Sequence, residues 1–265
     1  MHIAITGASS GIGAAFARHF ASQGHSLSLV ARRADHLTAL AQEIGPDTTH
    51  VAVHDLADPK RAAAWIPDAE AALGPIDVLV NNAGVQIVQA TRDVDPEEGE
   101  RLLAIDLMSP LRLTHAVLPG MLARGRGTIV DVASMAALAP TPGMTHYNAA
   151  KAGLAAASEA LRGELRGTGV HVVTVYPGII ESTAMAQAAL GKFEDSRLLA
   201  AFPKGTEAKL AELTLRAIVR RQDRVIYPRS GALSRWFPGA TRWLMDRVTP
   251  PLRNLPPLPA HGGAS

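Results

Sequence analysis

The chain has 265 residues, 47% of them hydrophobic and 19% charged, which is the composition of an ordinary globular protein. The absence of cysteine excludes disulfides, thiolate catalysis and cysteine-bound zinc, and a formal net charge of +2 is too small to indicate a nucleic-acid partner. Because the chain opens without a signal-like leader and has no apolar run of about eighteen residues, we expect a cytoplasmic enzyme with no membrane span.

The first predicted unit is a strand, a glycine-rich turn and a helix. An apolar run over residues 2–6 meets Gly7-Ala-Ser-Ser-Gly-Ile-Gly13, and an alanine-rich helical pattern continues to Gln23. Glycines let the backbone approach a phosphate, and the free N–H groups of the new helix favour its negative charge. The pattern alone fits equally well a tight turn that binds nothing.

The second predicted strand covers residues 26–31 and is followed by Arg32 and Arg33. A site for NAD usually has an acidic residue at this strand end, which binds the ribose 2′-hydroxyl. Here Ala31 stands in that place, and the guanidinium of Arg32 suits the 2′-phosphate of NADP. Two arginines are also typical of a solvated loop.

Strands and helices alternate along the following residues, which predicts right-handed crossovers and a parallel sheet. The predicted strands cover residues 50–53, 76–80, 128–133 and 170–175, and the predicted helices cover residues 35–44, 59–73, 96–121 and 145–166. We therefore predict one α/β domain over residues 1–227. Its expected architecture is a Rossmann-like, doubly wound parallel sheet with helices on both faces, and residues 228–265 form an extension.

Tyr147 and Lys151 lie four positions apart in a predicted helix, so their side chains share one face. A lysine ammonium beside a phenol favours the phenolate. We therefore expect the pKa of Tyr147 to fall below about 10, so that the phenol exchanges protons near neutral pH. Ser134 ends a buried strand pattern, where open α/β sheets bind their ligands. A tyrosine and a lysine at this spacing are, on their own, usually an ordinary surface pair.

Several motifs occur in the order and at the spacings of one family, and the chain resembles the compact, single-domain NAD(P)-dependent branch of the short-chain dehydrogenases/reductases. The motifs are Thr6-Gly-Ala-Ser-Ser-Gly-Ile-Gly13, Asp55-Leu56, Asn81-Asn-Ala-Gly84, Ser134, Tyr147-x-x-x-Lys151 and Pro177-Gly178. The resemblance covers residues 2 to about 185 and is loose beyond about residue 190.

The resemblance implies a nicotinamide dinucleotide, and the arginines after the second strand favour NADP(H) over NAD(H). No metal site is expected. The residues expected to bind the cofactor are Gly7, Ser9, Ser10, Gly11, Ile12, Gly13, Arg32, Arg33, Asp55, Leu56, Asn82, Ala83, Gly84, Tyr147, Lys151, Pro177, Gly178, Ile180, Ser182 and Thr183. Asn81 is expected to steady the central strand.

The resemblance also implies a catalytic set of Ser134, Tyr147, Lys151 and Asp106. Ser134 would bind the substrate carbonyl, Tyr147 would be the general acid or base, and Lys151 would hold the nicotinamide ribose. The family usually has asparagine where Asp106 stands, with a backbone carbonyl that supports a water next to the lysine. Aspartate tolerates that backbone role, but its carboxylate cannot replace an amide donor. The other reading is that Asp106 only caps a local kink.

These assignments predict reversible hydride transfer between NADP(H) and a carbonyl or secondary alcohol. Apolar residues after Ser134 and in a predicted substrate loop, about 183–205, favour a hydrophobic substrate, although they could equally pack on one another. They are Met135, Leu138, Pro140, Met144, Met185, Leu190 and Phe193. The alternative function is a nucleotide-sensing or scaffolding protein of the same fold with little or no turnover.

A row of small residues in the helix that carries Tyr147 predicts a homo-oligomer. Ala152, Ala155, Ala156 and Ala160 recur three or four positions apart, which allows close approach of a helix from a second subunit. The other reading is that this face packs on the subunit's own sheet.

Residues 235–248 combine aromatic side chains with arginines. On a helix beginning near Pro238, the residues Ala240, Trp243, Leu244 and Val248 share one face. This pattern is compatible with a peripheral membrane contact, with a lid over a hydrophobic pocket, or with packing on the body or a second subunit. The proline-rich residues 250–259 predict an extended or disordered tail.

Overall fold

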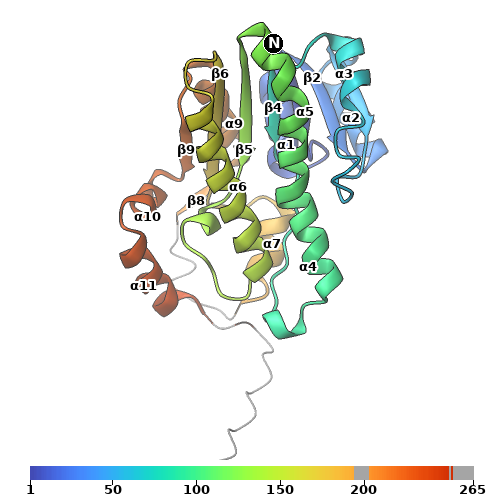
Figure 1. Ribbon diagram of the computed structural model, residues 1–265. Helices are drawn as coiled ribbons and strands as arrows, with labels where there is room; N and C mark the ends of the chain where they lie inside the picture. The colour runs from blue at the N-terminus through green and yellow to red at the C-terminus, as the bar shows by residue number, and fades with distance from the viewer. Residues whose placement is uncertain (194–202, 251, 253–265) are drawn as a thin grey trace, which may run out of the picture.

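The computed structural model describes residues 1–193, 203–250 and 252, apart from the side chains of Leu233, Pro238, Asp246 and Val248. It contains a seven-stranded parallel sheet in the order β3-β2-β1-β4-β5-β6-β9, with helices on both faces (Figure 1). The strands are β1 His2–Thr6, β2 Ser26–Ala31, β3 Thr49–Val53, β4 Val78–Asn81, β5 Gly127–Val132, β6 Val170–Pro177 and β9 Arg224–Tyr227. A separate two-stranded sheet pairs β7 Ile179–Ile180 with β8 Lys204–Gly205.

The helices divide into two layers because alternate strand residues point to opposite faces of the sheet. Ile3 and Ile5 belong to the core beneath α1, α2 and α9, whereas Ala4 belongs to the core beneath α3 and α5. The helices before β6 are α1 Gly11–Ser22, α2 Ala34–Ile44, α3 Ile66–Leu73, α4 Pro96–Leu103, α5 Ser109–Arg124 and α6 Thr145–Glu164. Those after it are α7 Ala184–Leu190, α9 Glu207–Val219, α10 Ala232–Trp236 and α11 Pro238–Val248. This arrangement confirms the predicted fold class.

The described residues also contain five short helical segments: η1 Pro46–Thr48, η2 Thr91–Asp93, η3 Ala104–Met108, η4 Met135–Ala137 and η5 Arg229–Gly231. The segment η3 is a π-helix and carries Asp106. It divides the continuous helix predicted over residues 96–121 into α4 and α5, which ends at Arg124 before a left-handed Gly125. Single π turns within helices often occur at functional sites.

Helix α3 begins later than the sequence predicts. Residues 59–65 form successive turns, and the helix starts only at Ile66. Pro67 explains the difference, because a proline inside a longer helix would lack an N–H donor and clash with the preceding turn. In the structure Pro67 lies in the first turn of α3. There no helical hydrogen bond needs its missing N–H, and no preceding turn clashes with its ring.

The alanine row on α6 faces two directions. Ala155 is buried within the subunit, beside Ala133 and Tyr176, whereas Ala156 and Ala160 are exposed. Part of the row therefore packs on the protein's own body, as one reading of the sequence had it. The exposed part is an outward-facing, small-residue surface.

The chain leaves the sheet at Tyr227 and continues through η5 into α10 and α11, which lie beside the lower end of the body in Figure 1. One carboxylate fastens α10 to the sheet and to α6. Glu159 accepts hydrogen bonds from Arg224 at 3.0 Å, Arg235 at 2.7 Å and the Tyr176 hydroxyl at 3.0 Å. Within the described residues, no helix is long and apolar enough to cross a membrane. Except for Pro250 and Leu252, the predicted proline-rich tail lies outside the described residues.

Candidate functional site

The turn between β1 and α1 requires glycine because the protein's own backbone leaves no room for side chains at two of its positions. A Cβ on Gly7, which has φ +68°, would lie 2.8 Å from Ala83 Cα, and one on Gly13 would lie 2.3 Å from the Gly7 carbonyl oxygen. The Ser10 side chain does not cap the N-terminus of α1. Free N–H groups and the positive end of the helix dipole therefore face this turn, as a phosphate group requires.

Arg33 reaches back over the same turn from the end of β2. Its Nη2 atom donates to Ser9 Oγ at 2.8 Å and to Ser10 Oγ at 2.7 Å. Arg32 also lines the cavity next to this turn, and Ala31, which ends β2, brings no carboxylate there. The sequence singled out Arg32, but in the structure it is Arg33 that contacts the turn.

The ends of β1 and β4 are joined by hydrogen bonds through Thr6. Its hydroxyl accepts from the backbone N–H groups of Asn82 and Ala83, both at 3.0 Å, and the Asn82 amide donates to the Thr6 carbonyl at 2.9 Å. Asn81 is buried instead and donates to Asp131 at 2.8 Å. Asn82 and Ala83 therefore face the cavity, while Asn81 links the central strands.

Ser134, Tyr147 and Lys151 come together where β5 ends and α6 begins. Ser134 follows β5, its Oγ atom accepting from the Ala136 N–H at 3.1 Å, and Tyr147 and Lys151 project from the first turns of α6. The Lys151 ammonium lies 5.8 Å from the centre of the Tyr147 ring and donates to the Val132 carbonyl at 3.1 Å. The helical spacing thus places both side chains on one face, as predicted.

Asp106 contributes its side chain to this group. Its Oδ2 atom lies 3.2 Å from Lys151 Nζ, its Oδ1 accepts from the Val85 N–H at 2.8 Å, and the residue is fully buried. A Cβ at Gly84 would approach Asp106 Oδ2 to 2.8 Å and Lys151 Nζ to 3.2 Å, so glycine is needed there. Sequence reasoning foresaw a backbone role or a local cap for Asp106. It missed the buried ion pair, which depends on how η3 turns the side chain.

The pKa of Tyr147 is raised, and the expectation that it would fall is therefore wrong for this structure. Burial of the phenol is the largest cause, because it disfavours the phenolate. Lys151 and the Ser134 hydroxyl oppose this effect, whereas the Asp106 carboxylate adds to it. Burial likewise raises the pKa of Asp106. The pKa of Lys151 is also raised, because Asp106 and Tyr147 outweigh the effect of burial.

The glycine turn, Arg33 and the group of Ser134, Tyr147, Lys151 and Asp106 line one cavity of about 720 Å³, which extends from the glycine turn past Tyr147 to α11. Among the predicted cofactor-binding and catalytic residues, Ser182 alone lies outside its lining, and its hydroxyl donates to Glu207. Five of the residues expected to shape the substrate pocket also line the cavity: Met135, Met144, Met185, Leu190 and Phe193. The others, Leu138 and Pro140, do not, and residues 194–202 of the predicted substrate loop lie outside the described residues.

Sequence reasoning did not place specific residues of α11 in this cavity, but Thr241, Leu244 and Met245 line it. Leu244 and Met245 lie three and four positions after Thr241, so the three residues share one side of the helix. The sequence left a lid over the pocket as one reading of this segment. The amphipathic pattern could have identified Leu244 as part of the apolar face of the helix. It could not show which side chains of the helix face the cavity.

The strand ends of this doubly wound sheet carry a turn suited to phosphate groups beside a serine, a tyrosine and a lysine. This is the architecture of a dinucleotide-dependent oxidoreductase. The chain belongs to the short-chain dehydrogenase family, whose model matches residues 1–192.

Relatives in this family are reductases and dehydrogenases. Sulfoacetaldehyde reductase 2 of Chromohalobacter salexigens is 39% identical over 183 residues, which are 68% of this chain and 73% of that protein. A fatty acyl-CoA reductase of Mycobacterium tuberculosis is 38% identical over 194 residues, which are 69% of this chain and 64% of that protein. A short-chain dehydrogenase of Sphingobium yanoikuyae in complex with NADPH is 33% identical, with a TM-score of 0.77, and the match covers 92% of this chain and 94% of that one.

Proposed function

We propose that the protein is an NADP(H)-dependent oxidoreductase that transfers hydride between the nicotinamide and a carbonyl or secondary alcohol of a hydrophobic substrate. The observation that carries this proposal is that Ser134, Tyr147 and Lys151 share one cavity with the glycine turn at the start of α1. A dinucleotide bound at that turn has its other end available to these three side chains.

The residues present fit such a cofactor. The free N–H groups at the uncapped start of α1 and the Ser9–Ser10–Arg33 cluster together suit phosphate groups. When bound, the cofactor supplies or accepts the hydride. Lys151 has three N–H donors, of which one binds the Val132 carbonyl and another faces Asp106, so a third remains to hold a ribose hydroxyl.

In the reductive direction, Tyr147 gives its phenolic proton to the oxygen of the substrate carbonyl, and the Ser134 hydroxyl donates to the same oxygen as negative charge develops. In oxidation, Tyr147 takes the alcohol proton. The raised pKa of Tyr147 keeps the phenol protonated, which suits its role as the acid in carbonyl reduction. Asp106 holds the Lys151 ammonium in place by the 3.2 Å ion pair.

The cofactor preference for NADP(H) rests on the end of β2. Ala31 offers no carboxylate to a ribose 2′-hydroxyl, and Arg32 and Arg33 supply two guanidinium groups at the cavity wall. Some relatives support the same preference, among them an NADP-dependent 3-hydroxy acid dehydrogenase of Salmonella typhi, 35% identical over 186 residues.

The substrate class rests on the side chains around the far end of the cavity. Met135, Met144 and Met185 line it together with Leu244 and Met245 of α11, and such apolar, adaptable walls favour a hydrophobic compound. The substrates in the relatives' names range from a sulfonated aldehyde to a fatty acyl-CoA, so the relatives do not indicate one substrate class. The apolar lining of the cavity is therefore what supports a hydrophobic substrate.

The oligomeric state belongs to the same proposal. We propose that the chain forms a homo-oligomer through the outer surfaces of α5 and α6. Ala156 and Ala160 are exposed there, and Leu111 is an exposed apolar side chain of α5.

The Tyr147→Phe variant tests the proposed chemistry, measured as NADPH oxidation with a panel of ketones and aldehydes. We expect kcat to fall by about 10²–10⁴-fold because the general acid is lost. Tyr227→Phe is the matched control. It also removes a tyrosine hydroxyl, but Tyr227 lies outside the cavity lining. Wild-type turnover in Tyr147→Phe would contradict the assignment. If the wild type binds NADPH but reduces no compound, a nucleotide sensor is the better description.

A further inference from the structure

Four large apolar side chains are exposed together on α10 and α11. Trp236 is 75% exposed, Phe237 62%, Trp243 58% and Leu244 47%, and we call this group the aromatic patch. The two helices follow β9 and lie beside the lower end of the body (Figure 1). Exposed aromatic side chains gathered in this way indicate an interaction surface.

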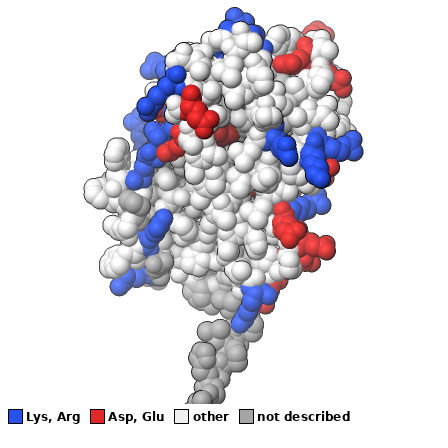
Figure 2. Space-filling model, viewed as in Figure 1, with Lys and Arg blue, Asp and Glu red and all other residues white. Residues whose placement is uncertain are grey.

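Positive charge surrounds the aromatic patch. Residues 229–249 contain four arginines and one acidic residue, a net charge of +3, whereas the whole chain carries only +2, so the other residues together carry −1. Figure 2 shows lysine or arginine side chains on the visible face over α10 and α11. The charge complementary to this surface is therefore negative.

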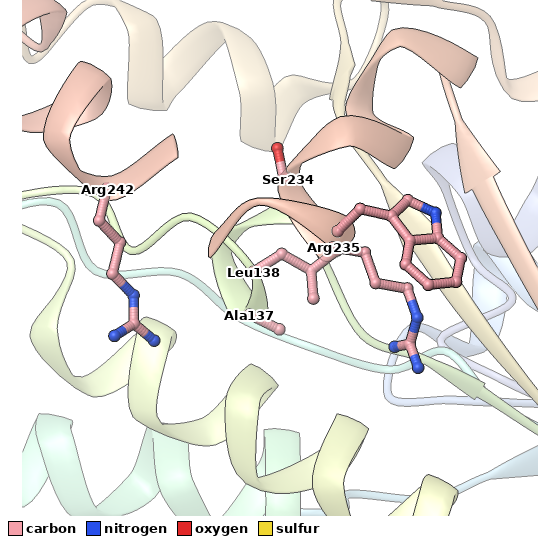
Figure 3. A pocket seen from close by; sticks show the side chains of 6 residues that line it. Ala137, Leu138, Ser234, Arg235 and Arg242 are labelled. Atoms are coloured by element: carbon pink, nitrogen blue, oxygen red, sulfur yellow. The ribbon is translucent and has the colours of Figure 1, made fainter. Parts of the chain in front are cut away.

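A hollow of about 310 Å³ lies between α10, α11 and the segment after Ser134. Ala137, Leu138, Ser234, Arg235, Trp236 and Arg242 line it. In Figure 3 the side chains of Arg235 and Arg242 extend on either side of Leu138 and Ala137. Arg235 is held by Glu159, whereas Arg242 is exposed on α11. Apolar walls flanked by guanidinium groups suit an anionic headgroup that carries an apolar chain.

We propose that residues 229–249 form a docking surface for an anionic lipid bilayer. Trp236, Phe237, Trp243 and Leu244 would enter the interfacial region, and Arg242 and Arg247 would lie among the headgroups. Tryptophan and arginine side chains suit this boundary because each has an apolar body and a polar or charged end. Each arginine near an anionic surface adds a favourable electrostatic contribution.

A second copy of this chain is the main competing occupant, and the charge argues against it. A twofold contact places the same patch on both subunits, so two surfaces of net charge +3, from four arginines and Asp246, would face each other. An anionic bilayer removes that repulsion. The proposal is independent of the oxidoreductase assignment, because lipid binding is measured without turnover.

Docking in this orientation would also place the α11 wall of the cavity next to the lipid. Leu244 belongs to both the aromatic patch and the cavity lining, and Met245 lines the cavity beside it. An apolar substrate dissolved in the bilayer would then reach the cavity past α11. This second step rests on the proposed function and fails with it, whereas the docking itself does not.

The test is co-sedimentation of the full-length protein with vesicles of phosphatidylcholine alone and with vesicles in which about a third of the lipid is phosphatidylglycerol. We expect the wild type to sediment with the anionic vesicles at low salt, and less with neutral vesicles or at high salt. The double variant Trp236→Ser/Trp243→Ser should bind the anionic vesicles about tenfold more weakly. Arg242→Glu should also weaken binding, and its remaining binding should depend less on salt.

Val219→Ser is the matched control, because Val219 is an equally exposed apolar residue at the end of α9, 65% exposed. It should bind like the wild type. Tryptophan emission gives a second readout: Trp65 is buried, so a blue shift on adding anionic vesicles would come from Trp236 and Trp243. The thermal unfolding of each variant shows whether it is folded.

Three results would overturn the proposal. The wild type could remain in the supernatant with both kinds of vesicle at low salt. The folded double tryptophan variant could sediment as the wild type does. Alternatively, light scattering could show that this variant loses an oligomer while its vesicle binding is unchanged, in which case the aromatic patch contacts a second copy of the chain.

Discussion

At the scale of one residue, Arg33 offers a test of the proposed preference for NADP(H). Its guanidinium already lies against Ser9 and Ser10 at the turn where phosphate groups would bind. We expect Arg33→Ala to raise the Kd for NADPH by roughly 10–100-fold, from the loss of a charge-assisted contact of about 1.5–3 kcal/mol, and to leave the Kd for NADH nearly unchanged. Calorimetric titration with both cofactors measures this.

Arg32→Ala is the comparison for that experiment, since Arg32 lines the same cavity but has no hydrogen bond to the turn. A larger effect in Arg32→Ala would assign the 2′-phosphate to Arg32, as the sequence favoured. Equal losses of affinity for NADPH and NADH in Arg33→Ala would contradict the proposed selectivity. They would mean that Arg33 binds a group that both cofactors contain.

Asp106 offers a second test at the scale of one residue. The Asp106 carboxylate raises the pKa of Tyr147, whereas the Lys151 ammonium lowers it. The carboxylate lies 3.2 Å from that ammonium and offsets its effect. The isosteric variant Asp106→Asn removes the negative charge, so the pKa of Tyr147 should fall. The pH profile of alcohol oxidation, which needs the phenolate, should move to lower pH, and carbonyl reduction should lose activity at a lower pH than in the wild type.

Asp93→Asn makes the same chemical change at a partly exposed site outside the cavity and should leave both profiles in place. If the profiles of Asp106→Asn superimpose on those of the wild type, the buried ion pair does not tune the tyrosine. The separate measurement of kcat and KM distinguishes this tuning from a simple loss of substrate binding.

Among the structural elements, α10 depends on Glu159 for its attachment. Burial alone would raise the pKa of Glu159, but hydrogen bonds from Arg224, Arg235 and Tyr176 outweigh it and lower the pKa from 4.5 to about 2. Because the folded-state pKa is depressed, this stabilisation is present above pH 4.5 and is lost as the pH falls towards 2. The side chain is 30% exposed, so solvent screening reduces the contribution to about 1–2 kcal/mol.

We therefore expect Glu159→Gln to lower the free energy of unfolding at pH 7 by about 1–2 kcal/mol, with the difference from the wild type shrinking as the pH falls below 4.5. Urea unfolding at several pH values measures it. Glu43→Gln, which removes an exposed partner of Arg18, should cost much less. A pH-independent difference would mean that Glu159 acts through packing rather than charge.

The elements also show what the sequence can and cannot predict. The strand ends that carry Gly7, Asn82 and Ser134 were predictable, because apolar runs bounded by glycine or polar residues are local signals. The start of α3 depends on Pro67, which is a local signal too, and the helix predicted over residues 59–73 begins too early because it passes through this proline. The π turn at Asp106 and the direction of α11 depend on packing between segments far apart in the chain, which no local pattern contains.

At the scale of the whole molecule, we expect a homo-oligomer in solution. The exposed Ala156 and Ala160 on α6 allow a second helix to approach closely, and Ala156→Glu would place a charge in that contact. Light scattering at micromolar concentration should show an oligomer for the wild type and a smaller mass for Ala156→Glu. Ala71→Glu, at an exposed position of α3, should keep the wild-type mass. A monomeric wild type would contradict this proposal.

The lining of the main cavity runs along the chain from Gly7 to Pro250. The turn suited to phosphates comes from the first strand and helix, the serine, tyrosine and lysine follow near the middle, and α11 is made among the last residues. During synthesis on a ribosome these parts emerge in that order. A nascent chain that has not yet released α11 would therefore hold the glycine turn and Ser134, Tyr147 and Lys151 without the α11 wall of the cavity.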